Sequence, residues 1–191
     1  MGEQRRSPMR QEGEDWSFNM ADRRTDTKDE KQFEERVVNI DRVARVVKGG
    51  RRFRFRALVV IGDQKGLVGV GSAKGADVTS AVSKAVEVAK KNSIKIKLYK
   101  GTLPHDTQAK VGGADILIMP ASAGTGLIAG GVVRTILEVG GVSNGLSKSL
   151  GSTNKTNIAY ATIEALKKLE FADKWITKQA PLSKKAKAGV R

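Results

Sequence analysis

The sequence contains no cysteine and a single histidine, His105. Without cysteine the chain has no disulfide framework, thiolate metal site or cysteine nucleophile, and one histidine excludes a multi-histidine metal cluster. No stretch reaches the roughly 18 consecutive apolar residues that a membrane helix needs, and the N-terminus lacks the apolar segment of a secretory signal. We therefore expect a cytoplasmic protein with no membrane segment, no metal and no cofactor.

Acidic residues are few relative to basic ones, with 20 Asp and Glu against 35 Lys and Arg and a net charge of +15. Hydrophobic residues make up 39% of the chain, enough to fill a core, so we do not expect a wholly disordered polycation. Residues 31–100 hold 17 basic and 6 acidic side chains, whereas residues 101–170 hold 6 and 5. A positive charge concentrated in one block indicates a surface that binds a polyanion.

Both ends of the chain differ in composition from its middle. Residues 1–32 mix both charge signs with few apolar groups and no periodicity, which predicts a disordered N-terminal extension. Residues 171–191 hold 6 basic residues and 1 acidic residue and predict a basic C-terminal tail. Two readings of this tail stay open, because it is either solvated or follows the phosphates of an RNA.

A strict alternation of arginine with apolar residues lies in residues 51–57. In a strand, Arg52, Arg54 and Arg56 project from one face, and Phe53 and Phe55 project from the other. We therefore expect the phenylalanine face to meet a core and the arginine face to meet an anion.

The residues around this strand predict a β-β-β-α domain over residues 33–98. Residues 37–47 are rich in β-branched side chains, and two glycines separate them from the arginine strand as in a hairpin tip. A third strand is predicted over residues 67–71. From Val78, apolar residues recur at helical spacing, with Asp77 placed to cap the helix. One helix behind three strands leaves the second face of the sheet or the hairpin tip free for a partner.

The basic residues of the predicted hairpin form our candidate RNA-binding site. Residues 36–56 contain eight basic residues and one acidic residue, and the arginine fork suits phosphate and guanine edges. A bland alternative is an edge strand whose charges only prevent aggregation. Aromatic residues make up 5% of the chain, so we expect folded RNA to be recognised by backbone and shape with little base stacking. The candidate residues are Arg42, Arg45, Lys48, Gly49, Gly50, Arg51, Arg52, Arg54 and Arg56.

Residues 99–170 predict a small α/β domain. A strand is expected over residues 95–98, just before this domain; within it we expect a buried central strand over 114–119 and helices over 132–139 and 156–170. A glycine-rich loop over residues 120–131 precedes the first of these helices.

That glycine-rich loop resembles the phosphate loop of galactokinase-type small-molecule kinases, since free N–H groups at a helix start can hold an anion. However, no Lys-Ser/Thr ending follows it, and no matching acidic pair could hold magnesium. His105 has no second histidine beside it, and Ser122, Ser143 and Ser152 have no base around them. We therefore expect an interface loop and no enzyme activity.

Three collinear segments, residues 43–55, 120–131 and 151–157, closely resemble the small-subunit ribosomal protein S5 family, most nearly its bacterial form. The resemblance implies an α+β protein: an N-terminal domain like a double-stranded-RNA-binding fold and a C-terminal α/β domain of the S5 type. It implies a structural, non-enzymatic role in the cytoplasmic ribosome, binding 16S-type ribosomal RNA near the head–body junction. It also implies a place at the mRNA entrance with proteins S3 and S4, and an influence on translational accuracy through S4.

The resemblance also implies roles for particular residues. The 48–51 turn matches a hairpin loop that reaches into ribosomal RNA, and Arg42, Arg45 and Arg51 match basic positions facing RNA or mRNA. Gly124, Gly126 and Arg134 match the segment associated with S4, and the C-terminal segment would lie toward S8. The alternative hypothesis is a free double-stranded-RNA-binding module, which gives no role to the second domain.

This sequence departs from the family's usual pattern at four positions: Val70, Ser72, Ala123 and Lys155. The first two stand where the family usually has Phe and Tyr, which puts part of the RNA contact of the third strand in doubt. The third replaces a Glu of the glycine loop, and the fourth replaces a Pro and adds one more donor and charge.

Overall fold

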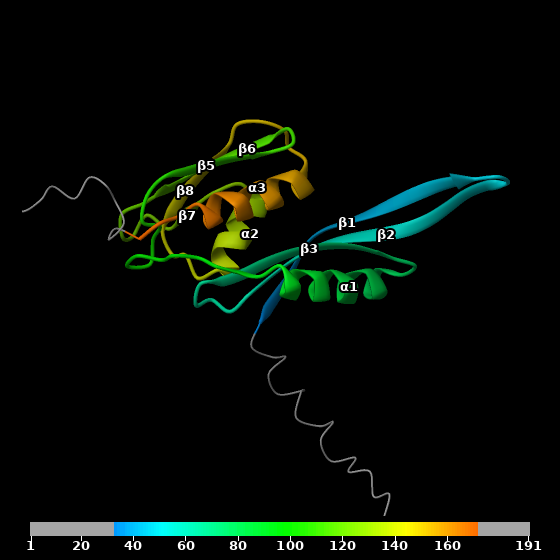
Figure 1. The fold of residues 1–191 in the computed structure, drawn as a ribbon, viewed down its shortest axis with the longest axis horizontal. Helices are drawn as coiled ribbons and strands as arrows, with labels where there is room; N and C mark the ends of the chain where they lie inside the picture. The colour runs from blue at the N-terminus through cyan, green and yellow to red at the C-terminus, as the bar shows by residue number, and fades with distance from the viewer. Residues whose placement is uncertain (1–32, 172–191) are drawn as a thin grey trace, which may run out of the picture. The chain divides into compact units, whose positions relative to one another are not determined.

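The computed structural model describes residues 33–171 (Figure 1). The predicted N-terminal extension and, apart from Phe171, the predicted basic tail lie outside the described residues. Two four-stranded sheets and three helices make up the described part, so the predicted α+β class is confirmed. No helix within residues 33–171 combines the length and the apolar character required to cross a membrane.

The first sheet has the order β1-β2-β3-β4 and is antiparallel throughout. Its strands are β1 (Glu34–Val47), β2 (Gly50–Gly62), β3 (Leu67–Gly75) and β4 (Ile94–Lys95), with α1 (Val78–Lys91) between the last two. The β-β-β-α order is as predicted, but β3 continues four residues past its predicted end. The strand predicted over residues 95–98 is wrong: only Ile94–Lys95 is a strand, and it extends the first sheet.

Helix α1 lies very close to β3 because glycine and alanine face each other there. A Cβ atom on Gly71 would lie 2.1 Å from the backbone oxygen of Ala85, and one on Gly69 would lie 2.3 Å from that of Ala89. Asp77 occupies the N-cap position as predicted, and its backbone N–H donates to Ser80 Oγ at 3.4 Å. The small side chains therefore set the distance between helix and sheet.

The second sheet has the order β5-β6-β8-β7, with the predicted buried strand in its interior. The strands are β5 (Thr107–Val111), β6 (Ala114–Pro120), β7 (Leu127–Ile128) and β8 (Gly145–Ser149), and the helices are α2 (Gly131–Val139) and α3 (Lys155–Lys167). Strands β5, β6 and β8 are antiparallel, whereas β7 is parallel to β8. Both predicted helices are present, α3 ending three residues earlier than expected.

The two faces of the first sheet are buried against different elements. Alternate residues of β2, including Val59 and Ile61, pack with the alanines of α1. Leu58 and Val60, of the other parity, belong to a larger core shared with α2, α3 and β6. The expectation that the second face of the sheet is open is therefore wrong over this part of β2. The division into two domains at residues 98 and 99 stays a prediction.

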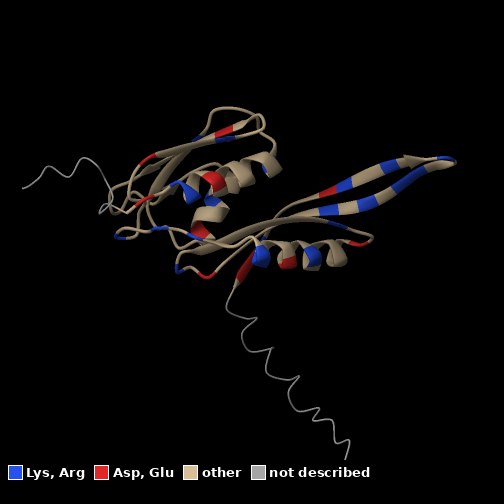
Figure 2. Cartoon of the chain, in the orientation of Figure 1, with Lys and Arg blue, Asp and Glu red and all other residues tan. Residues whose placement is uncertain are grey.

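Beyond this covered part, β1 and β2 continue as a two-stranded hairpin. The last β3 residue, Gly75, pairs with Phe55, so the strands from there to the turn at residues 48–49 have no third strand beside them. Figure 1 shows β1 and β2 running together to this turn. Figure 2 shows Lys and Arg side by side along both strands. We call this segment, residues 42–55, the hairpin arm.

Candidate nucleic-acid interface

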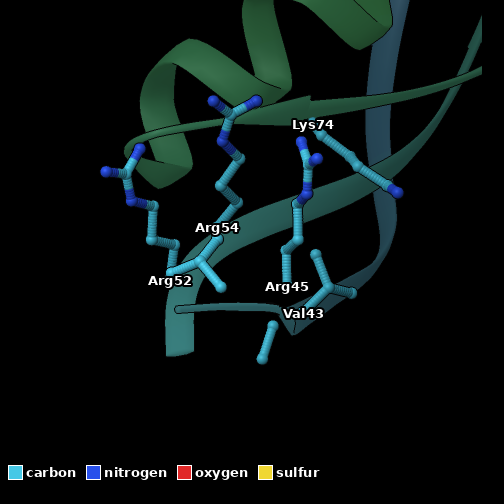
Figure 3. A pocket seen from close by; sticks show the side chains of 7 residues that line it. Val43, Arg45, Arg52, Arg54 and Lys74 are labelled. Atoms are coloured by element: carbon cyan, nitrogen blue, oxygen red, sulfur yellow. The ribbon is translucent and has the colours of Figure 1, made fainter. Parts of the chain in front are cut away.

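One face of the hairpin arm collects cations from three strands. Arg45 pairs directly across from Arg52, and Val43 lies across from Arg54, which places these side chains on the same face. Together with Lys74 of β3, the three arginines line a hollow of about 310 Å³ (Figure 3). We call this group, Arg45, Arg52, Arg54 and Lys74, the arginine face.

Like charges held this close repel one another unless an anion lies among them. The side chains lining the hollow include no Asp or Glu among the described residues. Arg45, Arg52 and Arg54 are exposed, so their guanidinium groups keep their donors for an outside partner. An arrangement of planar, permanently charged forks with free donors suits the phosphate oxygens of a nucleic acid.

Arg56, which the sequence places on the same face, is already engaged by the chain. Its guanidinium forms an ion pair with Asp41 on β1, with 2.7 Å between Nη2 and Oδ2. Hydrogen bonds from Arg56 and then from Asn39 lower the pKa of Asp41 below its ordinary value. Arg56 therefore has fewer donors left for RNA than its three neighbours.

Lys74 is a member of the arginine face that the sequence analysis did not find. It pairs across from Arg56 at the end of β3, in the part of that strand beyond the predicted end. Continuing the antiparallel register from the turn at residues 62–66 would have placed it there. The sequence does not predict this extension of β3, because Ser72, Ala73 and Lys74 are not typical of a buried strand.

The turn at the end of the hairpin arm carries Lys48 and Arg51, both exposed. Gly49 and Gly50 have φ values of +93° and +144°, conformations that glycine adopts without strain. A Cβ atom on either glycine would meet no atom within 4 Å, so the space around the tip is open. The tip can therefore approach another molecule closely.

The opposite face of the hairpin arm carries Arg42 and Phe53. The guanidinium carbon of Arg42 lies 3.9 Å from the centroid of the Phe53 ring. Phe53 is 49% exposed, so the expectation that both phenylalanines face a core is wrong for this residue, whereas Phe55 packs against the α1 cluster. The physical reason is that Phe53 lies beyond Phe55, where the third strand ends.

The glycine-rich loop is stabilised by its own chain. Gly124 and Gly126 have φ values of +91° and +72°, and their N–H groups donate to Asn144 Oδ1 at 3.2 and 2.9 Å. Two N–H groups that a phosphate would need are therefore already used. No Cβ contact would arise at either glycine, so the loop surface is open to a protein partner.

Arg134 belongs to a network of ion pairs joining α2 to β1. Glu138 accepts from Arg134 at 2.7 Å and from Arg36 at 2.6 Å, and Arg36 also donates to Glu34 at 2.6 Å. Hydrogen bonds from Arg134 and then Arg36 lower the pKa of Glu138, and hydrogen bonds from Gln64 and then Arg36 lower that of Glu34. The side chain predicted to meet S4 thus binds Glu138, the carboxylate that connects α2 to β1 through Arg36.

The lowered pKa of Glu138 predicts an acid-dependent loss of stability. A carboxylate whose folded pKa is depressed stabilises the fold above its unfolded pKa of about 4.3, and this contribution disappears as pH falls through the folded pKa. We expect Glu138→Gln to lower the free energy of unfolding by up to about 1 kcal/mol at pH 7, because the pairs are exposed. As the pH falls through the folded pKa of Glu138, variant and parent should converge.

Urea unfolding followed by circular dichroism between pH 3 and 7 measures this difference. The matched control is Glu164→Gln, which breaks the exposed pair with Lys167 one turn away on α3. That control should change stability by a few tenths of a kcal/mol at most. A constant difference between the Glu138→Gln and parent proteins across this pH range would contradict the assignment.

His105 has a structural contact, not a catalytic arrangement. Its Nε2 accepts the backbone N–H of Glu170 at 2.9 Å, and Nδ1 lies 2.7 Å from the backbone oxygen of Asp106. Within residues 33–171, no three side chains from His, Asp and Glu gather as they would around a metal ion. The imidazole therefore ties the end of the described chain to the loop before β5.

Lys155, one of the four positions singled out in the sequence, also joins the two halves of the chain. Its Nζ donates to Asn39 Oδ1 of β1 at 2.8 Å. Asn39 in turn donates to Asp41 at 2.7 Å, so the extra cation lies at the base of the hairpin arm.

Comparison with known proteins agrees with this arrangement. Residues 33–97 match the family described as ribosomal protein S5, N-terminal domain, and residues 109–179 match ribosomal protein S5, C-terminal domain. The chain is 49% identical over 141 residues to small ribosomal subunit protein uS5 of Bacteroides thetaiotaomicron, an overlap covering 74% of this chain and 82% of that relative. The chain therefore belongs to the ribosomal protein S5 family, whose members are structural proteins of the small ribosomal subunit and not enzymes.

Proposed function

We propose that this chain binds 16S-type ribosomal RNA near the head–body junction of the small subunit, through its hairpin arm. The observation that carries the proposal is the arginine face, where three exposed arginines and Lys74 surround a hollow without an acidic partner among the described residues. Uncompensated positive charge of this density stabilises a complex with phosphates by releasing their counterions. The ribosome of the bacterial cytoplasm is where such a partner is met.

We also propose that the chain lies at the path of mRNA and influences translational accuracy. The tip residues Lys48 and Arg51 would contact ribosomal RNA or incoming mRNA beside proteins S3 and S4. The open loop at Gly124 and Gly126, with the exposed side of Arg134, would meet S4. Through that contact the chain would influence decoding, and its C-terminal segment would lie toward S8.

The experiment that tests the RNA-binding proposal removes the two tip cations together. Each lost phosphate contact lowers the slope of log K against log salt by about 0.9, which is roughly fivefold in affinity near 0.15 M salt. We expect Lys48→Ala with Arg51→Ala to lower the slope by about 2 and affinity for small-subunit ribosomal RNA by about 30-fold. Filter binding at several salt concentrations gives both quantities.

The charge-matched control is Lys110→Ala with Lys148→Ala, two exposed lysines of the second sheet. We expect this pair to retain the parent's affinity and salt slope. Equal losses in both double variants would show that net charge alone binds the RNA and would overturn the proposal.

A second measurement separates a ribosomal protein from a free RNA-binding module. Sedimentation through sucrose at high salt should leave the chain in 30S particles, because the open loop at Gly124 and Gly126 offers a second surface to neighbouring proteins. A free module with several phosphate contacts would be stripped as salt rises.

A further inference from the structure

The Arg42 and Phe53 pair is a feature that neither the core nor the arginine face explains. Phe53 lies on the hairpin arm at 49% exposure, and Arg42, also exposed, covers its ring at 3.9 Å. A phenylalanine left on a two-stranded arm buries little apolar surface, so it stabilises the fold less than a core residue would. A cation over a ring is worth about 0.5–1 kcal/mol at an exposed site. The Arg42–Phe53 pair therefore contributes little to the stability of the isolated chain.

The strand register explains why these two side chains meet. Arg42 pairs across from Phe55, and Ala44 pairs across from Phe53, so Arg42 and Phe53 are diagonal neighbours on one face. Val46, at 76% exposure, and Arg51 pair with each other on that same face nearer the tip. This one face therefore carries a ring, an exposed apolar side chain and two guanidinium groups.

The face that carries Arg42 and Phe53 differs in chemistry from the arginine face. There, cations surround a hollow lined with Val43 and Val47 and no ring, which suits phosphate. Here the guanidinium carbon of Arg42 lies 3.9 Å from the centroid of the Phe53 ring, and the Arg42 side chain remains exposed. Guanidinium planes and aromatic rings are the surfaces on which unpaired RNA bases stack.

We propose that Arg42 and Phe53 form a stacking site for an unpaired base of small-subunit ribosomal RNA. The inference rests on the proposed RNA-binding function and adds a base contact to it. The base stacks on the exposed surface of the Arg42 guanidinium, while the Phe53 ring holds that guanidinium in place from the other side. Phosphates on either side of the base then reach Arg51 at the tip, on the same face.

The first test uses substitutions that keep charge and apolar character but remove the stack. Arg42→Lys retains the cation without the plane, and Phe53→Leu retains an apolar side chain without the ring. Stacking is worth about 1–3 kcal/mol for each base, so we expect about a tenfold loss of affinity for transcribed small-subunit ribosomal RNA in each. The salt slope should not change in either variant because no charge is lost.

The matched control is Arg36→Lys, the same substitution on the same strand but outside the hairpin arm. It should weaken binding by less than threefold. The double variant Arg42→Lys with Phe53→Leu should lose little more than Phe53→Leu alone, because the ring positions the guanidinium. Full-length protein is used throughout, and an unchanged circular-dichroism melting temperature verifies that folding is intact.

A spectroscopic test detects whether the RNA covers the site. The two native tryptophans, Trp16 and Trp175, are replaced by phenylalanine, and Phe53→Trp then reports from the site. Saturating ribosomal RNA should quench its emission at least twofold. Ile128→Trp, in the same background and on an exposed position of the near-neutral half, should keep its emission.

The outcomes separate this inference from the function on which it rests. If the parent binds the RNA with its full salt slope while Arg42→Lys and Phe53→Leu bind equally well, the stacking site is overturned and the phosphate-binding function stands. Unquenched emission from Phe53→Trp at saturation also overturns it. If the parent binds small-subunit RNA no more tightly than an unrelated RNA of equal length, both fail.

Discussion

Gly71→Ala is expected to destabilise this protein by about 3 kcal/mol, the upper end of the range for overpacking a core. The added Cβ would lie 2.1 Å from the backbone oxygen of Ala85 and 2.6 Å from the backbone nitrogen of Ala89. Both atoms belong to the backbone of α1, which cannot move aside by rotating a side chain. Relief requires the whole helix to lift from β3, which would open the apolar contacts of Ala81 with the sheet.

Chemical denaturation of purified parent and variant measures this cost, with the midpoint and the slope reported separately. The control is Gly131→Ala at the start of α2, where an added Cβ meets no atom within 4 Å and no unusual φ is required. That control should stay within about 0.5 kcal/mol of the parent. A cost below ~1 kcal/mol for Gly71→Ala would show that α1 adjusts its distance from the sheet freely.

Much of the fold follows from periodicity in the sequence. The alternation in residues 51–57 is a strand, the helical spacing from Val78 is α1, and the apolar run from Ala114 is a strand in the interior of its sheet. These elements are predictable because each has one strongly apolar face or is apolar throughout. The candidate arginines are also predictable, since exposure is the default for a guanidinium and parity decides its face.

Other elements lack such a signal. Strand β5 and strand β8 mix polar and apolar residues in five positions each, and β7 has two residues, so sequence periodicity does not distinguish them from loops. Which elements cover the second face of the first sheet also depends on contacts between segments far apart in the sequence. The one local hint was the run of apolar residues of both parities at 57–61, typical of a strand buried on two faces.

In the candidate site, the local sequence predicts on which face of the sheet a side chain lies, but not where the neighbouring strand and helix end. Parity alone assigns Phe53 to the α1 side of the sheet, which is correct. Parity does not say that α1 and β3 end before reaching that residue, and this difference turns a predicted core residue into an exposed one. Lys74 was missed for the same reason, because the end of β3 was placed too early.

Replacing the three arginines of the arginine face is expected to weaken RNA binding more than replacing the two tip cations. Arg45, Arg52 and Arg54 carry three of the charges around the hollow, and the described residues place no acidic side chain among them. Replacing all three by alanine should lower the salt slope by about 2.7, or three times 0.9 for each phosphate contact. At about 0.15 M salt this corresponds to a loss of affinity of roughly 100-fold or more.

Binding of full-length protein to transcribed small-subunit ribosomal RNA, titrated from low to high salt, measures both quantities. The charge-matched control is a triple alanine variant of α1 on the other side of the sheet, at Lys84, Lys90 and Lys91. It removes the same charge but should reduce affinity by less than tenfold, since distant exposed charges are screened over about 8 Å at this salt.

A second triple variant distinguishes charge from geometry. Replacing the same arginines by lysine keeps the charge, so the salt slope should remain close to that of the parent. Lysine presents a point charge without the two-pronged fork, and any excess loss of affinity therefore measures bidentate contacts to phosphate. The three arginines lie around one hollow, so their effects are coupled, and the losses of the single variants should not sum to the loss of the triple variant. Near-parental affinity and salt slope in the alanine triple would mean that the RNA does not occupy this face at all.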